Sequence, residues 1–281
     1  MTKKGQLTFA KSDPAISLAS LFRPVTRGRR LKGQVLESAW GDGLTLSFKI
    51  HTGLDTTDQS VFLTLVAMAA VKGRDIDKKT DSDIGRQLWL NLHDDDVGVQ
   101  YNGRATAFRT SYYEIIKEMG LTLSARSYAT LLSSLDRLDG VSFKAETSSS
   151  IYPSQRLLTY QVDKTNRNIA IVLNSRICQA LSGHYVRIEL AERHQLESDT
   201  SKVCHAWLCA WCGTGSSKSI GIDKLLTKIW GSDASSASTT RSRRQILRAG
   251  IKQIDKLPGW TIWEDDRGII RIKRDAILDA S

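Results

Sequence analysis

Hydrophobic and polar residues alternate in the N-terminal part of the chain and then change to a helical spacing. Apolar residues at every second position from 44 to 50 predict a strand with one buried face. The mostly apolar run 59–71 follows Asp-Thr-Thr-Asp at 55–58, which is typical of a helix with a capped start. We therefore expect a strand and then a buried helix over 44–71.

Two further helices are predicted in the middle of the chain. They span 111–119 and 124–138 and stop at Gly120 and Gly140, because glycine commonly terminates helices. The second helix is amphipathic, with Tyr128, Leu131, Leu135 and Leu138 expected inside and a separate polar face of Ser127, Thr130, Ser134 and Arg137. Strand patterns follow at 141–145, 157–162 and 169–173. A helix-turn-helix followed by paired strands is the winged-helix arrangement.

The same plan recurs near the C-terminus. Leu-Asp-Arg-Leu-Asp-Gly at 135–140 is matched by Ile-Asp-Lys-Leu-Pro-Gly at 254–259, and each motif precedes an alternating strand pattern. Helices are expected at 222–230 and 238–257, and strands at 260–264 and 269–273 around a turn at 265–268. The repeat predicts an α+β, mainly helical chain with two tandem winged-helix units. We expect a basic N-terminal arm over 1–35, a first domain over 36–174 and a second over 175–281.

The helix predicted at 238–257 has a basic face. Residues three and four positions apart share one side of a helix, and this spacing groups Arg241, Arg244, Arg248 and Lys252. A separate apolar face consists of Leu247, Ile251 and Ile254. The hydroxyls that could cap the helix and bind phosphate belong to Ser238, Thr239 and Thr240. Two interpretations stay open for this segment, a DNA-reading helix and a solvated basic surface.

Composition favours a nucleic-acid partner. The chain has 281 residues and a formal charge of +10, which favours a polyanion. The longest apolar run, 61–71, is too short to cross a membrane and no secretory signal is apparent, so we expect a cytoplasmic protein. The N-terminal arm could lie on phosphate or on another protein, and its basic residues are Lys3, Lys4, Lys11, Arg23, Arg27, Arg29, Arg30 and Lys32.

Candidate sites for metals and catalysis are weak. Cys209 and Cys212 lie with His205 in one helical pattern, whereas structural zinc usually takes ligands from two separate elements, so we expect buried, reduced cysteines. The segment 213–219 resembles a phosphate loop but has Ser217 where that motif requires glycine, and we interpret it as a solvated loop between helices. His-Asp-Asp-Asp at 93–96 is interpreted as an exposed acidic loop. We expect no cofactor and no enzymatic activity.

Several short strings along nearly the whole chain match one family. They are Ser-Asp-Pro-Ala at 12–15, Leu-Phe-Arg at 21–23, Leu-Val-Ala-Met-Ala at 65–69, Gly-Arg-Gln-Leu at 85–88, Tyr-Val-Arg-Ile at 185–188, Leu-Glu-Ser-Asp-Thr at 196–200, Leu-Cys-Ala-Trp at 208–211 and the segment 230–248. In order and spacing the sequence resembles the RepC replication initiators of IncQ-type plasmids. The resemblance implies a tandem winged-helix protein that binds direct repeats (iterons) in a plasmid origin. It also implies that the protein helps to open adjacent AT-rich DNA, so that a plasmid-encoded helicase and primase can load.

This interpretation assigns DNA contacts to particular residues. We expect Arg243, Arg244 and Arg248 to contact base edges or nearby phosphates. Thr239, Thr240 and Arg241 are expected to contact the DNA backbone at the start of the helix. Lys252 lies at the end of the same basic face. Weaker candidates in the first domain are Ser124, Arg126, Ser127 and Thr130. The wing residues expected on phosphates are Lys144, Arg267, Arg271 and Lys273, and those of the arm are Arg27, Arg29 and Arg30. A transcriptional regulator with the same two units is the alternative, and self-association stays open.

Overall fold

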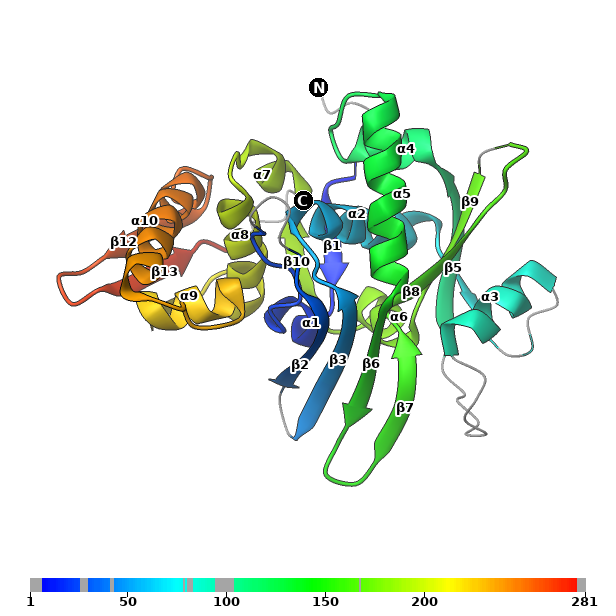
Figure 1. The fold of residues 1–281 in the computed structure, drawn as a ribbon, viewed down its shortest axis with the longest axis horizontal. Coiled ribbons are helices and arrows are strands. Elements are labelled where there is room, and N and C mark those ends of the chain that lie inside the picture. Colours follow the sequence, from blue (N-terminus) through cyan, green and yellow to red (C-terminus); the bar gives the residue numbers. More distant parts are fainter. Residues whose placement is uncertain are drawn as a thin grey trace.

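In the part of the chain that the structure describes, the fold combines helices with four antiparallel sheets (Figure 1). The structure is a computed structural model, and it describes residues 7–25, 30–40, 43–77, 79, 83–93, 104–166 and 168–276. The α+β class is therefore confirmed, but strands are too numerous in these ranges for the mainly helical chain that we expected. None of the helices in these ranges has both the length and the apolar character needed to span a bilayer.

One four-stranded sheet holds the predicted alternating strand. Its order is β2 (Lys32–Trp40), β3 (Leu44–Thr52), β6 (Val141–Glu146) and β7 (Ile151–Arg156). Leu46, Phe48 and Ile50 of β3 are buried, because alternate side chains of a strand point to the same face. Phe48 lies opposite Phe143 of β6, with ring centroids 5.5 Å apart. Strand β3 thus lies between β2 and β6, and its alternating apolar residues form the buried face that the sequence predicted.

A second four-stranded sheet has the order β4 (Arg74–Ile76), β5 (Ala105–Ser111), β9 (Asn168–Leu173) and β8 (Leu158–Val162). Helix α3 (Asp83–His93) packs on it through a small separate cluster that includes Leu88, Trp89 and Leu92. The main core surrounds α2 (Thr56–Lys72), which is the predicted buried helix. Its start has a capping box, in which the Asp55 carboxylate accepts from the backbone of Asp58 and the Asp58 carboxylate accepts from that of Asp55.

Helices α4 (Tyr112–Glu118) and α5 (Ala125–Asp139) pack on α2 and confirm the helix pair predicted there. Leu131, Leu135 and Leu138 of α5 are buried as expected. The predicted polar face is wrong at its C-terminal end, because Ser134 is fully buried and Arg137 is bonded to the buried carboxylate of Asp58. Both residues therefore face the core and not the solvent.

The C-terminal part consists of α8 (Asp199–Trp211), β11 (Ser217–Gly221), α9 (Ile222–Trp230), α10 (Ala237–Ile254), β12 (Trp260–Glu264) and β13 (Ile269–Arg274), drawn in yellow to red in Figure 1. The strands form a sheet of order β11-β13-β12. Helices α9 and α10 and both strands of the hairpin lie where the sequence predicted them. The predicted solvated loop at 213–219 is wrong in its second half, because β11 begins at Ser217 and pairs with β13.

The two halves correspond element by element. Helices α2, α4 and α5 match α8, α9 and α10, and the ladder β5-β9-β8 matches β11-β13-β12. The repeated motif lies at the C-terminal end of α5 in one half, and in the other it begins at Ile254, the last residue of α10. The hairpin equivalent to β12–β13 is therefore β8–β9, whereas β6 and β7 form an extra hairpin that joins β3. Lys144, which we placed in a wing, lies in β6 opposite Ser47, and is exposed.

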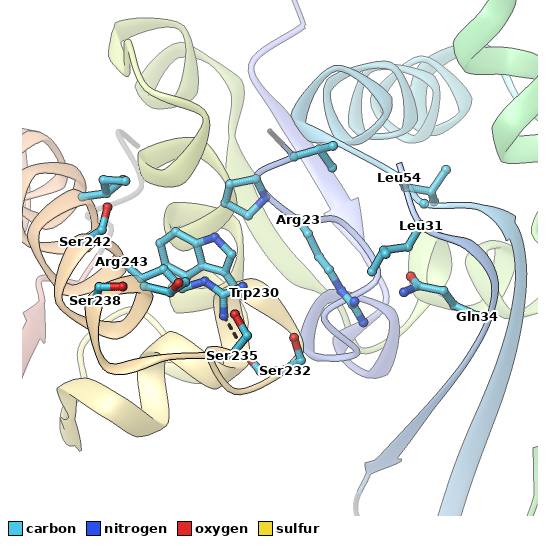
Figure 2. Close-up of a pocket in the computed structure, with 15 residues that line it drawn as sticks. Arg23, Leu31, Gln34, Leu54, Trp230, Ser232, Ser235, Ser238, Ser242 and Arg243 are labelled. Atoms are coloured by element: carbon cyan, nitrogen blue, oxygen red, sulfur yellow. Dashed lines mark hydrogen bonds between the residues drawn. The ribbon is translucent and has the colours of Figure 1, made fainter. Parts of the chain in front are cut away.

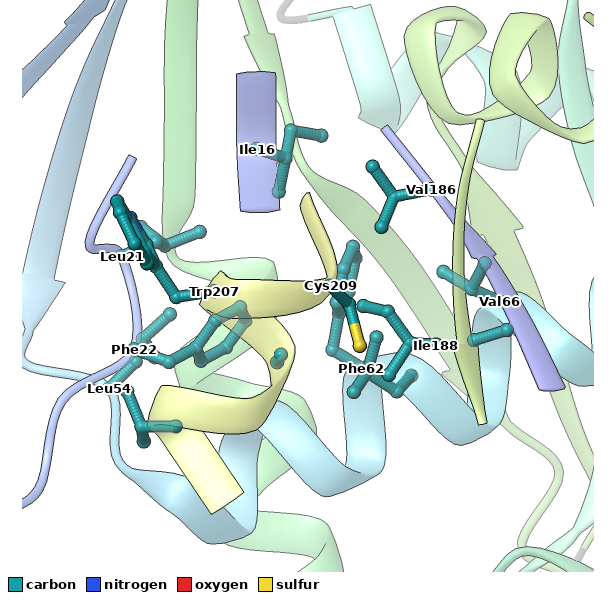
Figure 3. Packing of buried hydrophobic residues seen from close by; sticks show 14 of the residues in the cluster. Ile16, Leu21, Phe22, Leu54, Phe62, Val66, Val186, Ile188, Trp207 and Cys209 are labelled. Carbon is teal, nitrogen blue, oxygen red and sulfur yellow. The ribbon is translucent and has the colours of Figure 1, made fainter. Parts of the chain in front are cut away.

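Part of the predicted basic arm belongs to the core. Strand β1 (Phe9–Ser12) pairs with β10 (Val186–Glu189), and α1 (Pro14–Leu18) packs on α8. Figure 3 shows Leu21, Phe22 and Leu54 around Trp207 of α8. Helices α6 (Ser175–Ser182) and α7 (Leu190–Gln195) connect the halves, and one hydrophobic cluster continues across the boundary that we predicted at 174.

Candidate nucleic-acid interface

Helix α10 starts at a cluster of hydroxyl groups. Its N-cap is Ser236, whose Oγ accepts from the Thr239 backbone nitrogen at 3.2 Å, so the cap lies before the three residues that we predicted. The Thr240 hydroxyl donates to the Ser236 carbonyl at 3.0 Å, and the Thr239 hydroxyl lies 2.9 Å from the Ser236 Oγ. No acidic residue occurs in the first turn of this helix. The helix start therefore presents hydroxyls and partial positive charge to the solvent.

One face of α10 is buried and the opposite face is open. Leu247, Gly250, Ile251 and Ile254 are buried. Gly250 allows close packing, because a Cβ there would lie 3.2 Å from the Ser201 backbone nitrogen of α8. The exposed residues on the other side include Arg241, Gln245, Arg248 and Lys252. Gln245 was missed in the sequence analysis, although its position four residues after Arg241 places it on the same face.

Two arginines of the predicted basic face are paired with carboxylates. Arg244 donates from Nε and Nη2 to Asp223 of α9, at 2.7 and 2.6 Å. Arg248 donates from Nε and Nη2 to Glu264 of β12, both at 2.7 Å. The hydrogen bonds from these arginines lower the pKa of both carboxyl groups. The face is therefore less positive than the helix alone predicts, because its counter-charges come from other elements.

Arg243 lies away from this face. Its guanidinium donates to the Ser232 carbonyl at 3.0 Å and lies 5.5 Å from the Trp230 ring centroid. It lines a cleft of about 720 Å³ together with Arg23 of the N-terminal segment (Figure 2). The lining includes Leu31, Gln34, Ser235, Ser238 and Ser242. The Arg243 side chain thus lines the cleft, and its hydrogen bond to Ser232 connects α10 to the turn between α9 and α10.

The C-terminal hairpin divides its basic residues between two places. Arg267 lies exposed in the turn, where Gly268 adopts a φ of 74° that favours glycine. Arg271 and Lys273 alternate with the buried Ile270 and Ile272, so they point to the sheet face away from α10. Both form ion pairs at the surface: Arg271 Nη2 lies 3.3 Å from Asp265 Oδ2, and Lys273 Nζ lies 3.6 Å from Asp275 Oδ1. Arg267 in the turn is thus separated from Arg271 and Lys273, which lie within strand β13.

The first unit presents fewer basic groups. Ser124 caps α5 by accepting from the Ser127 backbone nitrogen at 3.1 Å, and the Ser127 hydroxyl donates to the Thr122 carbonyl. Arg126 is exposed, while Thr130 is half-buried and lines a separate cavity near α7 and α8. The four residues of this unit that we predicted to contact DNA thus lie around the start of α5, and Arg126 is the charged one among them.

The basic arm contributes one described candidate, and that one is structural. Arg30 donates to the Gly53 carbonyl at 2.8 Å and to Asp58 at 3.0 Å, and it is also paired with Asp55. Its guanidinium is therefore engaged by carboxylates at the start of α2, while its assignment to phosphate stays a prediction. Arg27 and Arg29 lie outside the described residues.

The cysteines behave as expected for buried side chains. Cys204, Cys209 and Cys212 are buried with free thiols, and Cys178 is partly buried. The Cys209 sulfur lies 3.7 Å from His205 Nε2, whose main partner is Glu192 at 2.7 Å. Within the described ranges no three His, Cys, Asp or Glu side chains gather around a metal-sized space. The acidic run 94–96 lies outside those ranges.

Comparisons with known proteins give one family, from a family model, and one shared fold, from solved structures. The family model described as Replication protein C (RepC) matches residues 4–276. A crystal structure of RctB domains 2 and 3 superposes with a TM-score of 0.54 at 10% identity, over 94% of this chain and 97% of that chain. A second structure of these RctB domains gives a TM-score of 0.50 at 10% identity, over 90% and 95%. Among curated protein sequences, none matches the chain significantly.

Proposed function

Since the chain belongs to the Replication protein C (RepC) family and is a replication initiator, we propose that it recognises direct repeats in its origin through two winged-helix units. Each unit would consist of three helices and a three-stranded antiparallel sheet. The element order of α8, β11, α9, α10 and the β12–β13 hairpin supports this proposal for the second unit. The matching order of α2, β5, α4, α5 and β8–β9 supports it for the first.

Helix α10 would enter the major groove, and its exposed face carries the proposal. Arg241, Gln245, Arg248 and Lys252 lie on the side opposite the buried Leu247 and Ile254. Arginine can donate two hydrogen bonds to guanine, and glutamine can pair with adenine in the same groove. The hydroxyl-rich start of α10 and Arg267 of the hairpin would hold flanking phosphates. Arg126 of α5 would add a weaker contact, as would Arg27 and Arg29.

Binding would be followed by opening of AT-rich DNA next to the repeats. The resemblance to initiators of IncQ-type plasmids supports a plasmid-encoded helicase and primase as partners. It also supports a protein that acts in the bacterial cytoplasm without a catalytic step of its own. Two linked units can bind neighbouring groove segments, because the first contact raises the effective concentration of the second.

A footprint on the origin of its own replicon tests the proposal. We expect protection that repeats at a regular spacing, together with permanganate-reactive thymines in the adjacent AT-rich tract. A protein that protects one operator and leaves the AT-rich tract closed would be a transcriptional regulator. Arg241→Ala should weaken the protection, whereas Lys49→Ala, an exposed change in β3 outside both proposed winged-helix units, serves as a matched loss of charge elsewhere.

A further inference from the structure

Arg244 and Arg248 are held by their carboxylates in the same geometry. Each guanidinium uses Nε and one hydrogen of Nη2 to meet both oxygens of one carboxylate, Asp223 or Glu264. The two carboxylates come from different elements, the start of α9 and the end of β12. The repetition of one geometry from two separate elements suggests a shared role at this surface.

Side-on pairing leaves the outer end of each guanidinium available. Arginine has five N–H donors in a planar fork, and the pairing occupies the Nε hydrogen and one Nη2 hydrogen. The remaining Nη1 and Nη2 hydrogens at the outer end are parallel. Two parallel donors match the O6 and N7 acceptors that guanine presents in the major groove. The carboxylates thus leave the base-reading edge free while they fix the plane of the fork.

Folding stability does not account for these pairs. The Arg244 and Asp223 side chains are 40% and 61% exposed, and those of Arg248 and Glu264 are 47% and 24% exposed. Exposed ion pairs contribute little to folding, because water and salt screen them. They do, however, cancel two of the positive charges of α10, and positive charge is what attracts phosphate irrespective of base sequence.

We propose that Asp223 and Glu264 are specificity-determining positioning residues, which aim Arg244 and Arg248 at guanine and withhold both arginines from phosphate. The proposal rests on the function proposed above for α10. It predicts that removing either carboxylate increases binding to any DNA while it decreases preference for the cognate sequence. Losing a purely structural contact would weaken both kinds of binding together.

The test uses the full chain and a duplex that the wild-type protein selects from a random library. Affinities for this duplex and for a scrambled one are measured for wild type, Asp223→Asn, Glu264→Gln and the double variant. Asp266→Asn is the matched control, because Asp266 is an exposed hairpin carboxylate for which the described residues show no ion pair. Asp223→Glu tests rescue, and thermal unfolding verifies that each variant is folded.

We expect the ratio of cognate to scrambled affinity to fall about tenfold in Asp223→Asn and Glu264→Gln. The slope of log affinity against log salt on scrambled DNA should steepen by about one for each released arginine. The control should keep both values, and Asp223→Glu should restore most of the ratio. Replacing contacted guanines with 7-deazaguanine should weaken the wild type much more than the double variant.

Unchanged ratios in folded Asp223→Asn and Glu264→Gln would overturn this inference alone, provided that the wild type prefers its selected duplex. A fall in the ratio that the control shares would also overturn it, because the effect would then be one of net charge. If the wild type selects no sequence at all, the proposed function fails and this inference fails with it.

Discussion

Helices α5 and α10 occupy equivalent places in the two units, but their exposed faces differ. The open face of α10 includes Arg241, Gln245 and Lys252. The open face of α5 includes Arg126, Leu132 and Asp136, so its charges cancel and its remaining surface is small or apolar. The comparison teaches that an equivalent position in the fold does not carry an equivalent surface. We therefore expect most of the sequence-specific contact from α10.

The arginine near the end of α5 shows where the difference comes from. Arg137 donates to Asp58 at 2.7 Å, and Asp58 is completely buried. Arg248 of α10 meets a carboxylate at the same distance but remains at the surface. The first unit thus uses its arginine to hold α5 on α2, whereas the second keeps its arginines where DNA could reach them.

The second unit is anchored by a different buried group. His205 of α8 is fully buried, and its Nε2 lies 2.7 Å from Glu192 of α7. The same carboxylate oxygen accepts from the Trp260 indole of β12 at 3.1 Å. Glu192 therefore joins α7, α8 and the C-terminal hairpin. The two anchors consist of different residues on different elements, so each can be tested separately by its own substitution.

The largest expected effect is the loss of the first anchor. Asp58→Asn should lower the free energy of unfolding by about 3–5 kcal/mol, because it leaves the Arg137 and Arg30 guanidiniums without their buried carboxylate. Urea denaturation measures the change. Asp223→Asn is the control, since its partner is exposed, and it should stay within about 1 kcal/mol of wild type. Equal losses would contradict the distinction between a structural and a surface arginine.

A pH series tests the second anchor. Burial alone would lower the pKa of His205, but the Cys209 sulfur and the hydrogen bond with Glu192 together raise that pKa to about 9. An unfolded imidazole has a pKa of about 6.5. The stabilisation is therefore complete below pH 6.5 and is lost as pH rises towards 9, about 3–4 kcal/mol in all. Urea denaturation across this range should show the fall in wild type.

Two histidine variants separate this effect from other titrations. His205→Gln should be less stable near pH 6 and should lose the dependence between pH 6.5 and 9. His184 is exposed, so His184→Gln should keep the wild-type dependence. A wild-type stability that stays constant over this range would show that the buried imidazole is neutral.

The two helices can be compared directly by removing one arginine from each. Arg244→Ala should weaken binding to the cognate duplex by about 1–3 kcal/mol and relax discrimination at one base pair. Arg126→Ala should cost less than about 1 kcal/mol and leave base preference unchanged. Competition binding with duplexes that carry single base-pair changes measures both. A larger loss of discrimination from Arg126→Ala would assign the reading helix to the first unit.

The smallest effect is expected at the far face of the C-terminal sheet. Lys273 points away from α10 and is exposed, so Lys273→Ala should weaken all sequences alike, by less than about 1 kcal/mol. Binding to cognate and scrambled duplexes at several salt concentrations measures this. A change in base preference would place Lys273 in the groove and contradict the arrangement of the strands.

Local patterns predicted the elements of both units well. The helix expected at 222–230 is Ile222–Trp230, and the helix expected at 124–138 is Ala125–Asp139. The strands expected around the 265–268 turn are β12 and β13. These elements were predictable because hydrophobic spacing and glycine or capping residues act within a few positions along the chain.

Contacts between distant residues were not predictable in the same way. Nothing near Arg244 or Arg248 indicates that Asp223 and Glu264 will neutralise them, because those partners lie on other elements. Arg30 was assigned to DNA for a similar reason, since its carboxylates belong to the following helix start. The DNA contacts assigned to Thr239, Thr240, Arg241 and Lys252 stay predictions, and the domain boundaries stay predictions as well.

The pairing of β1 with β10 has a consequence during synthesis of the protein. Phe9 lies opposite Glu189, so the first strand finds its partner only after most of the chain has left the ribosome. At about 5–20 residues per second, that interval is on the order of ten seconds or more. The apolar Ile16, Leu21 and Phe22 have no completed core to enter until then. The nascent first half is therefore expected to depend on chaperones until residues 186–189 have emerged.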